Sequence, residues 1–91
     1  MADHNVDICN DWNGSPGNKV TFTNNTGGPC TITQDGTNTW PFKDGPPLPA
    51  TGSIPNGGTL VTHLKNPLAD GPYPYKVTGC DDMTPKIVTV P

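Results

Sequence analysis

Sulfur-bearing side chains are the residues of this chain best suited to chemistry. The 91-residue sequence contains three cysteines, Cys9, Cys30 and Cys80, and Met83 follows the last of them after two residues. Thiolates and thioethers are ligands that soft metals prefer, and two thiols can instead form a disulfide. Three cysteines allow three different bridges, and the sequence alone does not choose among them.

The other reactive side chains form no recognisable catalytic pattern. The only serines, Ser15 and Ser53, lack a nucleophile-elbow context, and the chain has neither a CxxC redox pair nor a glycine-rich phosphate loop. The adjacent carboxylates of Asp81 and Asp82 could hold a hard cation weakly, although a solvated loop is the simpler interpretation. We therefore expect a non-enzymatic protein that has no cofactor.

The charge balance argues against a nucleic-acid partner. The net charge is −3, the five basic side chains are all lysines, and no run of like charges occurs. A surface that follows a phosphate backbone needs clustered lysine and arginine. No apolar run approaches the roughly 20 residues that cross a bilayer, and the first residues, MADHNVDIC, lack the basic and apolar regions of a secretion signal. We expect a protein or small-molecule partner and no transmembrane segment.

Short β-branched and aromatic runs between turn-forming residues predict an all-β domain. The 11 glycines and 12 prolines separate these runs, and no helical stripe of useful length is present. The pattern predicts one domain over residues 1–91, a small Greek-key β-sandwich of about seven short strands. Alternation places strands at residues 6–9, 19–24, 31–34, 59–64, 73–77 and 87–90.

Two connecting segments are predicted to be irregular. Residues 10–18 are dense in turn formers, and Trp12 within them is interpreted as a lid on the core. Residues 35–54 contain Pro46, Pro47 and Pro49, which lack the amide donors that a central strand needs. This segment should cross the edge of the sandwich, and a proline-rich ligand motif is the alternative interpretation.

Two motifs resemble the cupredoxins, which are small blue-copper electron carriers. The first is the strand VTFTNN, which a short turn connects to PCTIT. The second is GPYPYKVTGCDDM, whose glycine, two tyrosines and methionine keep the spacing of the family's C-terminal copper loop. The likeness spans about residues 19–90, apart from residues 43–53. It implies a cupredoxin-like fold of the plastocyanin and amicyanin kind.

The resemblance also identifies the positions of the copper ligands. Cys30 and Cys80 take the places of the two histidines, Val77 takes the place of the cysteine, and Met83 matches the axial methionine. A blue-copper centre needs a thiolate and two imidazoles. Because Val77 has no lone pair, the resemblance implies that the type 1 copper ligands are largely lost. Blue-copper electron transfer is therefore the weakest of the alternatives.

The resemblance further implies that Cys30 and Cys80 meet where a relative would hold its metal. We expect them to form a disulfide, which would close about fifty residues and stabilise the fold by up to roughly 4 kcal/mol. Cys9 would then be a buried, inert thiol on the first strand. If Cys30 and Cys80 stay reduced, they and Met83 would instead suit Cu(I), or Zn(II) with a further ligand.

These implications lead to one expected function. The protein should be a copper-free cupredoxin-like domain that acts as a structural or binding module, with soft-metal binding as the alternative. The resemblance and the expected disulfide favour a periplasmic or extracellular location, since disulfides persist in oxidising compartments. A cytoplasmic location is the alternative.

Overall fold

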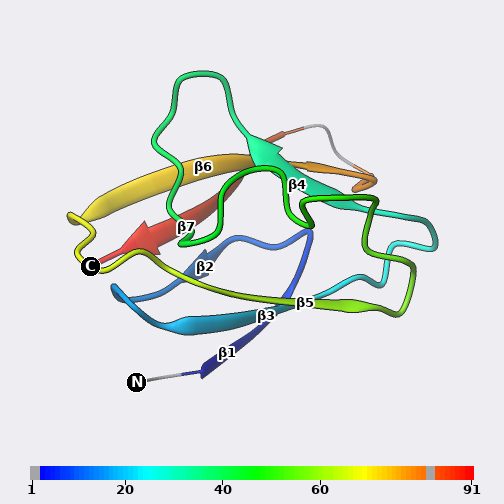
Figure 1. Cartoon of the computed structure of the whole chain (residues 1–91), viewed down its shortest axis with the longest axis horizontal. Helices are drawn as coiled ribbons and strands as arrows, with labels where there is room; N and C mark the ends of the chain where they lie inside the picture. Colours follow the sequence, from blue (N-terminus) through cyan, green and yellow to red (C-terminus); the bar gives the residue numbers. More distant parts are fainter. Residues whose placement is uncertain (1–2, 82–83) are drawn as a thin grey trace.

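The computed structural model describes residues 3–81 and 84–91 and shows two β-sheets that form a small β-sandwich (Figure 1). These residues contain no α-helix, which confirms the all-β prediction. One sheet has the strand order β1-β3-β5 and the other β2-β7-β6-β4. The strands are β1 (Asp3–Asp7), β2 (Trp12–Asn13), β3 (Lys19–Thr23), β4 (Thr31–Gln34), β5 (Thr59–His63), β6 (Gly71–Thr78) and β7 (Lys86–Val90).

Each sheet contains one parallel pair. Strand β1 runs parallel to β3, and β2 runs parallel to β7, whereas β5, β6 and β4 join their neighbours in antiparallel pairs. Parallel neighbours need a crossover connection. The chain between β1 and β3 provides it by passing through β2, so that it visits the opposite sheet before it returns.

Aromatic side chains fill the space between the sheets. Phe22, Phe42 and Tyr75 are fully buried, and their ring centroids lie 5.3 to 6.2 Å apart in edge-to-face arrangements. Trp12 is partly buried against this cluster, as the sequence predicted for a lid. Its indole Nε1 donates a hydrogen bond of 3.0 Å to the Tyr75 hydroxyl, which connects the lid to the core.

The environment of Tyr75 favours its neutral form. Burial raises the pKa of Tyr75 well above the usual value for a phenol. The hydrogen bond from Trp12 opposes this increase in pKa, and the negative charge of Asp11 adds to it. The Tyr75 side chain is therefore a neutral phenol within the core.

Most predicted strands are present, and the largest differences lie near the N-terminus, although β6 also begins two residues earlier than the predicted 73–77. The first strand ends at Asp7 instead of extending over 6–9, because the Asp7 side chain accepts the Cys9 amide at 2.9 Å and the Asp7 carbonyl accepts the Asn10 amide at 3.0 Å. These bonds turn the chain. Strand β2 lies within the segment that was predicted to be a loop.

The proline-rich connection is irregular, as predicted, and it links the two sheets at their edge. Leu48 forms an isolated bridge with Ile32 on β4, and Phe42 forms one with Leu64 at the end of β5. Within the part of the chain that the structure describes, no helix is both long enough and apolar enough to cross a membrane.

Candidate functional site at the disulfide end

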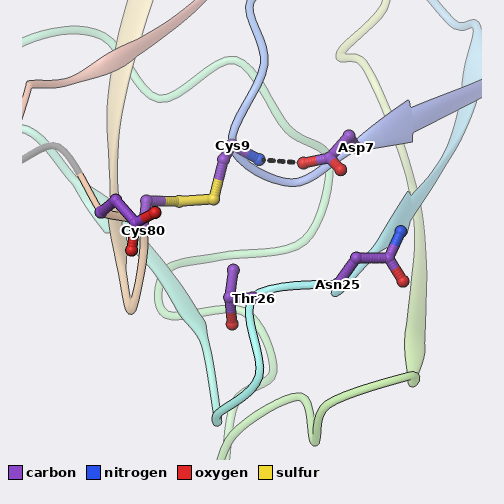
Figure 2. Close-up of a pocket in the computed structure, with 6 residues that line it drawn as sticks. Asp7, Cys9, Asn25, Thr26 and Cys80 are labelled. Carbon is purple, nitrogen blue, oxygen red and sulfur yellow. Dashed lines mark hydrogen bonds between the residues drawn. A yellow bond between two sulfur atoms is a disulfide. The ribbon is translucent and has the colours of Figure 1, made fainter.

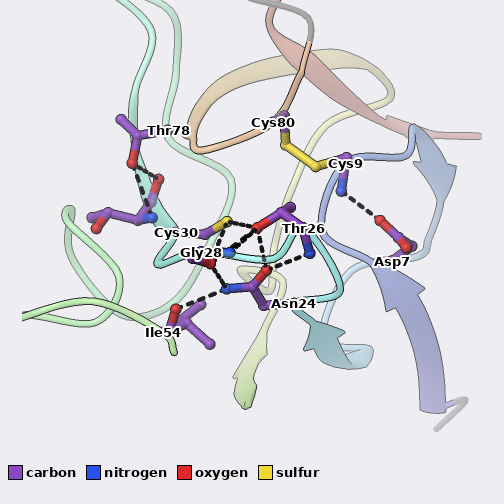
Figure 3. Close-up of a disulfide and its surroundings, with 10 residues drawn as sticks. Asp7, Cys9, Asn24, Thr26, Gly28, Cys30, Ile54, Thr78 and Cys80 are labelled. Atoms are coloured by element: carbon purple, nitrogen blue, oxygen red, sulfur yellow. Dashed lines mark hydrogen bonds between the residues drawn. A yellow bond between two sulfur atoms is a disulfide. The ribbon is translucent and has the colours of Figure 1, made fainter. Parts of the chain in front are cut away.

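A disulfide connects Cys9 to Cys80 at one end of the sandwich (Figure 3). Cys9 lies in the turn after β1 and Cys80 in the loop after β6, so the bridge joins segments that follow strands of different sheets. The Cα atoms are 5.7 Å apart, although 71 positions separate the two residues in sequence. The bridge therefore closes a loop that contains most of the chain.

This pairing corrects two expectations. The predicted Cys30–Cys80 disulfide is wrong, and so is the prediction that Cys9 is an inert thiol on the first strand. The physical reason is the turn after Asp7, which ends the strand early and carries Cys9 across to the loop of Cys80. The resemblance to cupredoxins spans residues that follow this turn, so it contains no information about where Cys9 lies.

Cys30 is a free, fully buried thiol beside the disulfide loop. Its backbone pairs with Ile54 through hydrogen bonds of 2.9 and 2.7 Å, and its sulfur lies 3.3 Å from the Thr26 hydroxyl. A Cβ added to Gly79 would lie 2.8 Å from the Cys30 sulfur and 2.6 Å from the Pro29 carbonyl oxygen. The structure thus brings Cys30 next to the residue that precedes Cys80 but leaves it unpaired.

Gly79 makes this close approach feasible. Its φ of +98° is a conformation that L side chains rarely adopt, and the space that a Cβ would need is already occupied. A side chain at this position would force apart the two loops that carry Cys30 and Cys80. Gly79 is therefore a positioning residue that sequence analysis did not single out.

Asn24 holds the loop that leads to Cys30. Its side chain is fully buried, and its amide nitrogen donates to the carbonyl oxygens of Gly28 and Ile54, both at 2.8 Å. Its amide oxygen accepts the Thr26 backbone amide at 3.0 Å and the Thr26 hydroxyl at 2.7 Å. One side chain thereby satisfies four polar groups and places Thr26 against the Cys30 sulfur (Figure 3). In the sequence, the feature that indicates this role is that Asn24 directly follows the alternating residues of the VTFTNN motif.

A cavity of about 340 Å³ opens beside the disulfide (Figure 2). Its walls are mainly polar, and the carboxylates on them belong to Asp7 and Asp81. The Asp7 carboxylate is already engaged, since it accepts the Cys9 amide. The residues that line the cavity are Asp7, Cys9, Asn25, Thr26, Cys80 and Asp81.

The residues that the resemblance assigns to copper positions do not fit a blue-copper centre. Val77, on β6, lies opposite Ile32 and packs against the core, and it offers no ligand atom. Cys80 is bonded to Cys9, so its sulfur is not a thiolate. The soft-metal set of Cys30, Cys80 and Met83 would require this disulfide to be reduced. Met83 lies outside the described residues.

The remaining sequence candidate was the pair of carboxylates at Asp81 and Asp82. Asp81 is exposed on the rim of the cavity, and its neighbour Asp82 lies outside the described residues. Over residues 3–81 and 84–91, no group of three or more histidine, cysteine or acidic side chains could hold a metal ion. The geometry of this end is that of a covalent connection between loops.

Comparison with known proteins found no matching protein-family model, no matching curated protein and no matching solved structure.

Proposed function

We propose that this protein is a copper-free cupredoxin-like domain that acts as a non-enzymatic structural or binding module in the periplasm or outside the cell. One observation carries the proposal: Cys80, at a ligand position of the resemblance, is bonded to Cys9. Val77, at the thiolate position, adds to it because valine cannot bind copper. A covalent bridge and an aliphatic side chain thus occupy positions at which a relative would bind its metal.

The bridge suits a module whose loops present a rigid surface. It connects the turn after β1 with the loop after β6, and Asn24 and Gly79 hold the neighbouring loop segments close to it. A domain of 91 residues has a small core, so a cross-link of this kind contributes a substantial part of its stability. A disulfide also fits an oxidising compartment, which supports the proposed location.

A copper titration tests the first part of the proposal. Addition of Cu(II) to the native, oxidised protein should produce no intense blue absorption, because no thiolate is available at position 77. An intense thiolate-to-copper band in the wild-type protein would contradict the proposal.

A designed variant tests the cupredoxin-like correspondence. Cys30→His, Cys80→His and Val77→Cys together restore the ligand types, and Cys9→Ser removes the thiol that the lost bridge would release. This quadruple variant should turn blue with Cu(II) if the positions correspond. The matched control lacks only Val77→Cys and should bind copper without that colour. Circular dichroism shows whether both variants are folded, and a folded but colourless quadruple variant would argue against the correspondence.

A further inference from the structure

A second cavity, of about 500 Å³, lies at the end of β5 and has a cationic rim. Lys43 and Lys65 supply the positive charge of the rim beside the imidazole of His63, and Pro67 supplies apolar surface. Its volume lies within the usual range for small-molecule sites. This combination sets it apart from the cavity beside the disulfide, whose charged side chains are both acidic.

Backbone pairing explains why the basic side chains gather here. Phe42 and Leu64 form an isolated bridge and are both buried, so they point into the core. Their neighbours Lys43, His63 and Lys65 must then point outward, because successive side chains of an extended chain alternate. Hydrogen bonds of 2.8 Å fix this pairing, from the Lys43 amide to the His63 carbonyl and from the Lys65 amide to the Pro41 carbonyl.

A third lysine extends the positive surface. Lys19 on β3 lies directly opposite His63 on β5, so the two side chains occupy the same face of the sheet. Two of the five lysines of an acidic chain therefore line one cavity, and Lys19 is the strand partner of His63, which also lines it. An ion pair joins Lys76 to Asp35, and neither of these residues lines this cavity.

Nearby acidic residues neutralise this surface only in part. Asp3 lies opposite Lys19 across the β1–β3 pair, so Lys19 is the most compensated of the three lysines. Asp44 follows Lys43 in sequence, but its carboxylate accepts the hydroxyl of Thr62, a buried residue of β5, at 2.9 Å. Lys43 and Lys65 are thus the cations best placed to bind a ligand.

We propose that this cavity binds a small organic carboxylate, with its charged group between Lys43 and Lys65 and its apolar part against Pro67. Charge complementarity carries the choice of ligand, since an anion gains from both ammonium groups where a neutral molecule gains from neither. The chain has no arginine, so two lysines would hold the anionic group as point charges, and the apolar surface of Pro67 favours an organic anion over an inorganic one. The inference rests on the binding role proposed above and gives it a ligand class.

The test is a titration of the native, oxidised protein with phenylacetate, followed by the amide signals of a ¹⁵N-labelled sample. We expect saturable shifts at residues 43 and 63–65, with a dissociation constant on the order of 1 mM. Phenylacetamide has the same shape without the charge and should bind about tenfold more weakly. Equal binding of the two compounds, or shifts that do not saturate, would overturn the proposal.

Matched variants locate the site. Lys43→Gln with Lys65→Gln should weaken phenylacetate binding about tenfold, since both ammonium groups are removed. Lys76→Gln removes the same kind of charge from β6 and should leave the affinity unchanged. Unchanged affinity in the double variant, or an equal loss in Lys76→Gln, would refute the assignment. The amide spectra of the variants also report their folding. Failure here would leave the copper results intact, so it is distinguishable from failure of the proposed fold relationship.

Discussion

Removal of the Cys9–Cys80 bridge should lower the free energy of unfolding by about 4 kcal/mol. The chain-entropy model of a cross-link gives this magnitude for a loop of the observed length, since the two residues are 71 positions apart. Small domains of this size have a total free energy of unfolding of roughly 5 to 14 kcal/mol. The double variant Cys9→Ser, Cys80→Ser should therefore lose between about a third and most of its stability.

Urea denaturation followed by tryptophan fluorescence measures this loss. The midpoint of the double variant should fall by about 2 M, given the usual dependence of stability on urea for small domains. Wild-type protein in reductant should unfold like the double variant. The control is Cys30→Ala, which keeps the bridge and should respond to reductant as strongly as the wild type does.

Two results would refute the assigned pairing. The first is a Cys30→Ala variant that no longer responds to reductant, since Cys30 would then belong to the bridge. The second comes from alkylation of the denatured, unreduced protein followed by peptide mapping, which should label Cys30 alone. A label on Cys9 or Cys80 would show that the sulfurs are paired differently.

Three further predictions concern the residues that position the loops and the core. Asn24→Ala should lower the free energy of unfolding by about 2 to 4 kcal/mol, because it deprives several polar groups of their hydrogen-bond partner. The control Asn25→Ala changes the exposed neighbour and should lower it by less than about 0.5 kcal/mol. Urea denaturation measures both variants. Gly79→Ala should lower the urea midpoint far more than Gly27→Ala, since both glycines have positive φ (+98° and +92°) but only Gly79 has atoms within 3 Å of an added Cβ. Equal losses would contradict the close approach at Gly79. The raised pKa of Tyr75 means that the folded protein holds the phenol proton more tightly than the unfolded chain, so its contribution to stability is complete below about pH 10 and is lost as the pH rises above that value. The melting temperature should therefore decline above about pH 10, and a Tyr75→Phe variant that declines equally would refute this reasoning.

Local patterns were enough to place most strands. The alternation of Val20 and Phe22 with threonines predicted a half-buried strand over 19–24, and β3 spans Lys19–Thr23. The prediction for 31–34 coincides with β4, Thr31–Gln34. In both segments one face of the strand packs against the core, so the alternation of apolar and polar residues along the sequence is enough to predict the strand.

Strand β2 is the strand that residue alternation could not predict. It contains only Trp12 and Asn13, which is too short for an alternation to be visible. Its partners are Val88 and Thr89 on β7, near the other end of the chain. The pairing depends on the packing of the whole sandwich. Because the residues on either side of β2 are turn formers, the local sequence predicts a loop instead.

The sequence by itself determined the all-β class, the alternating strands and the irregular proline-rich connection, because each depends on residue types and their local spacing. Only the tertiary structure decided which sulfurs meet and which basic side chains share a cavity. Cys9 reaches Cys80 across 71 positions, and Lys43 reaches Lys65 through the pairing of Phe42 with Leu64. Such contacts arise from the way two sheets close over one core, and no local pattern specifies which strand ends come together there.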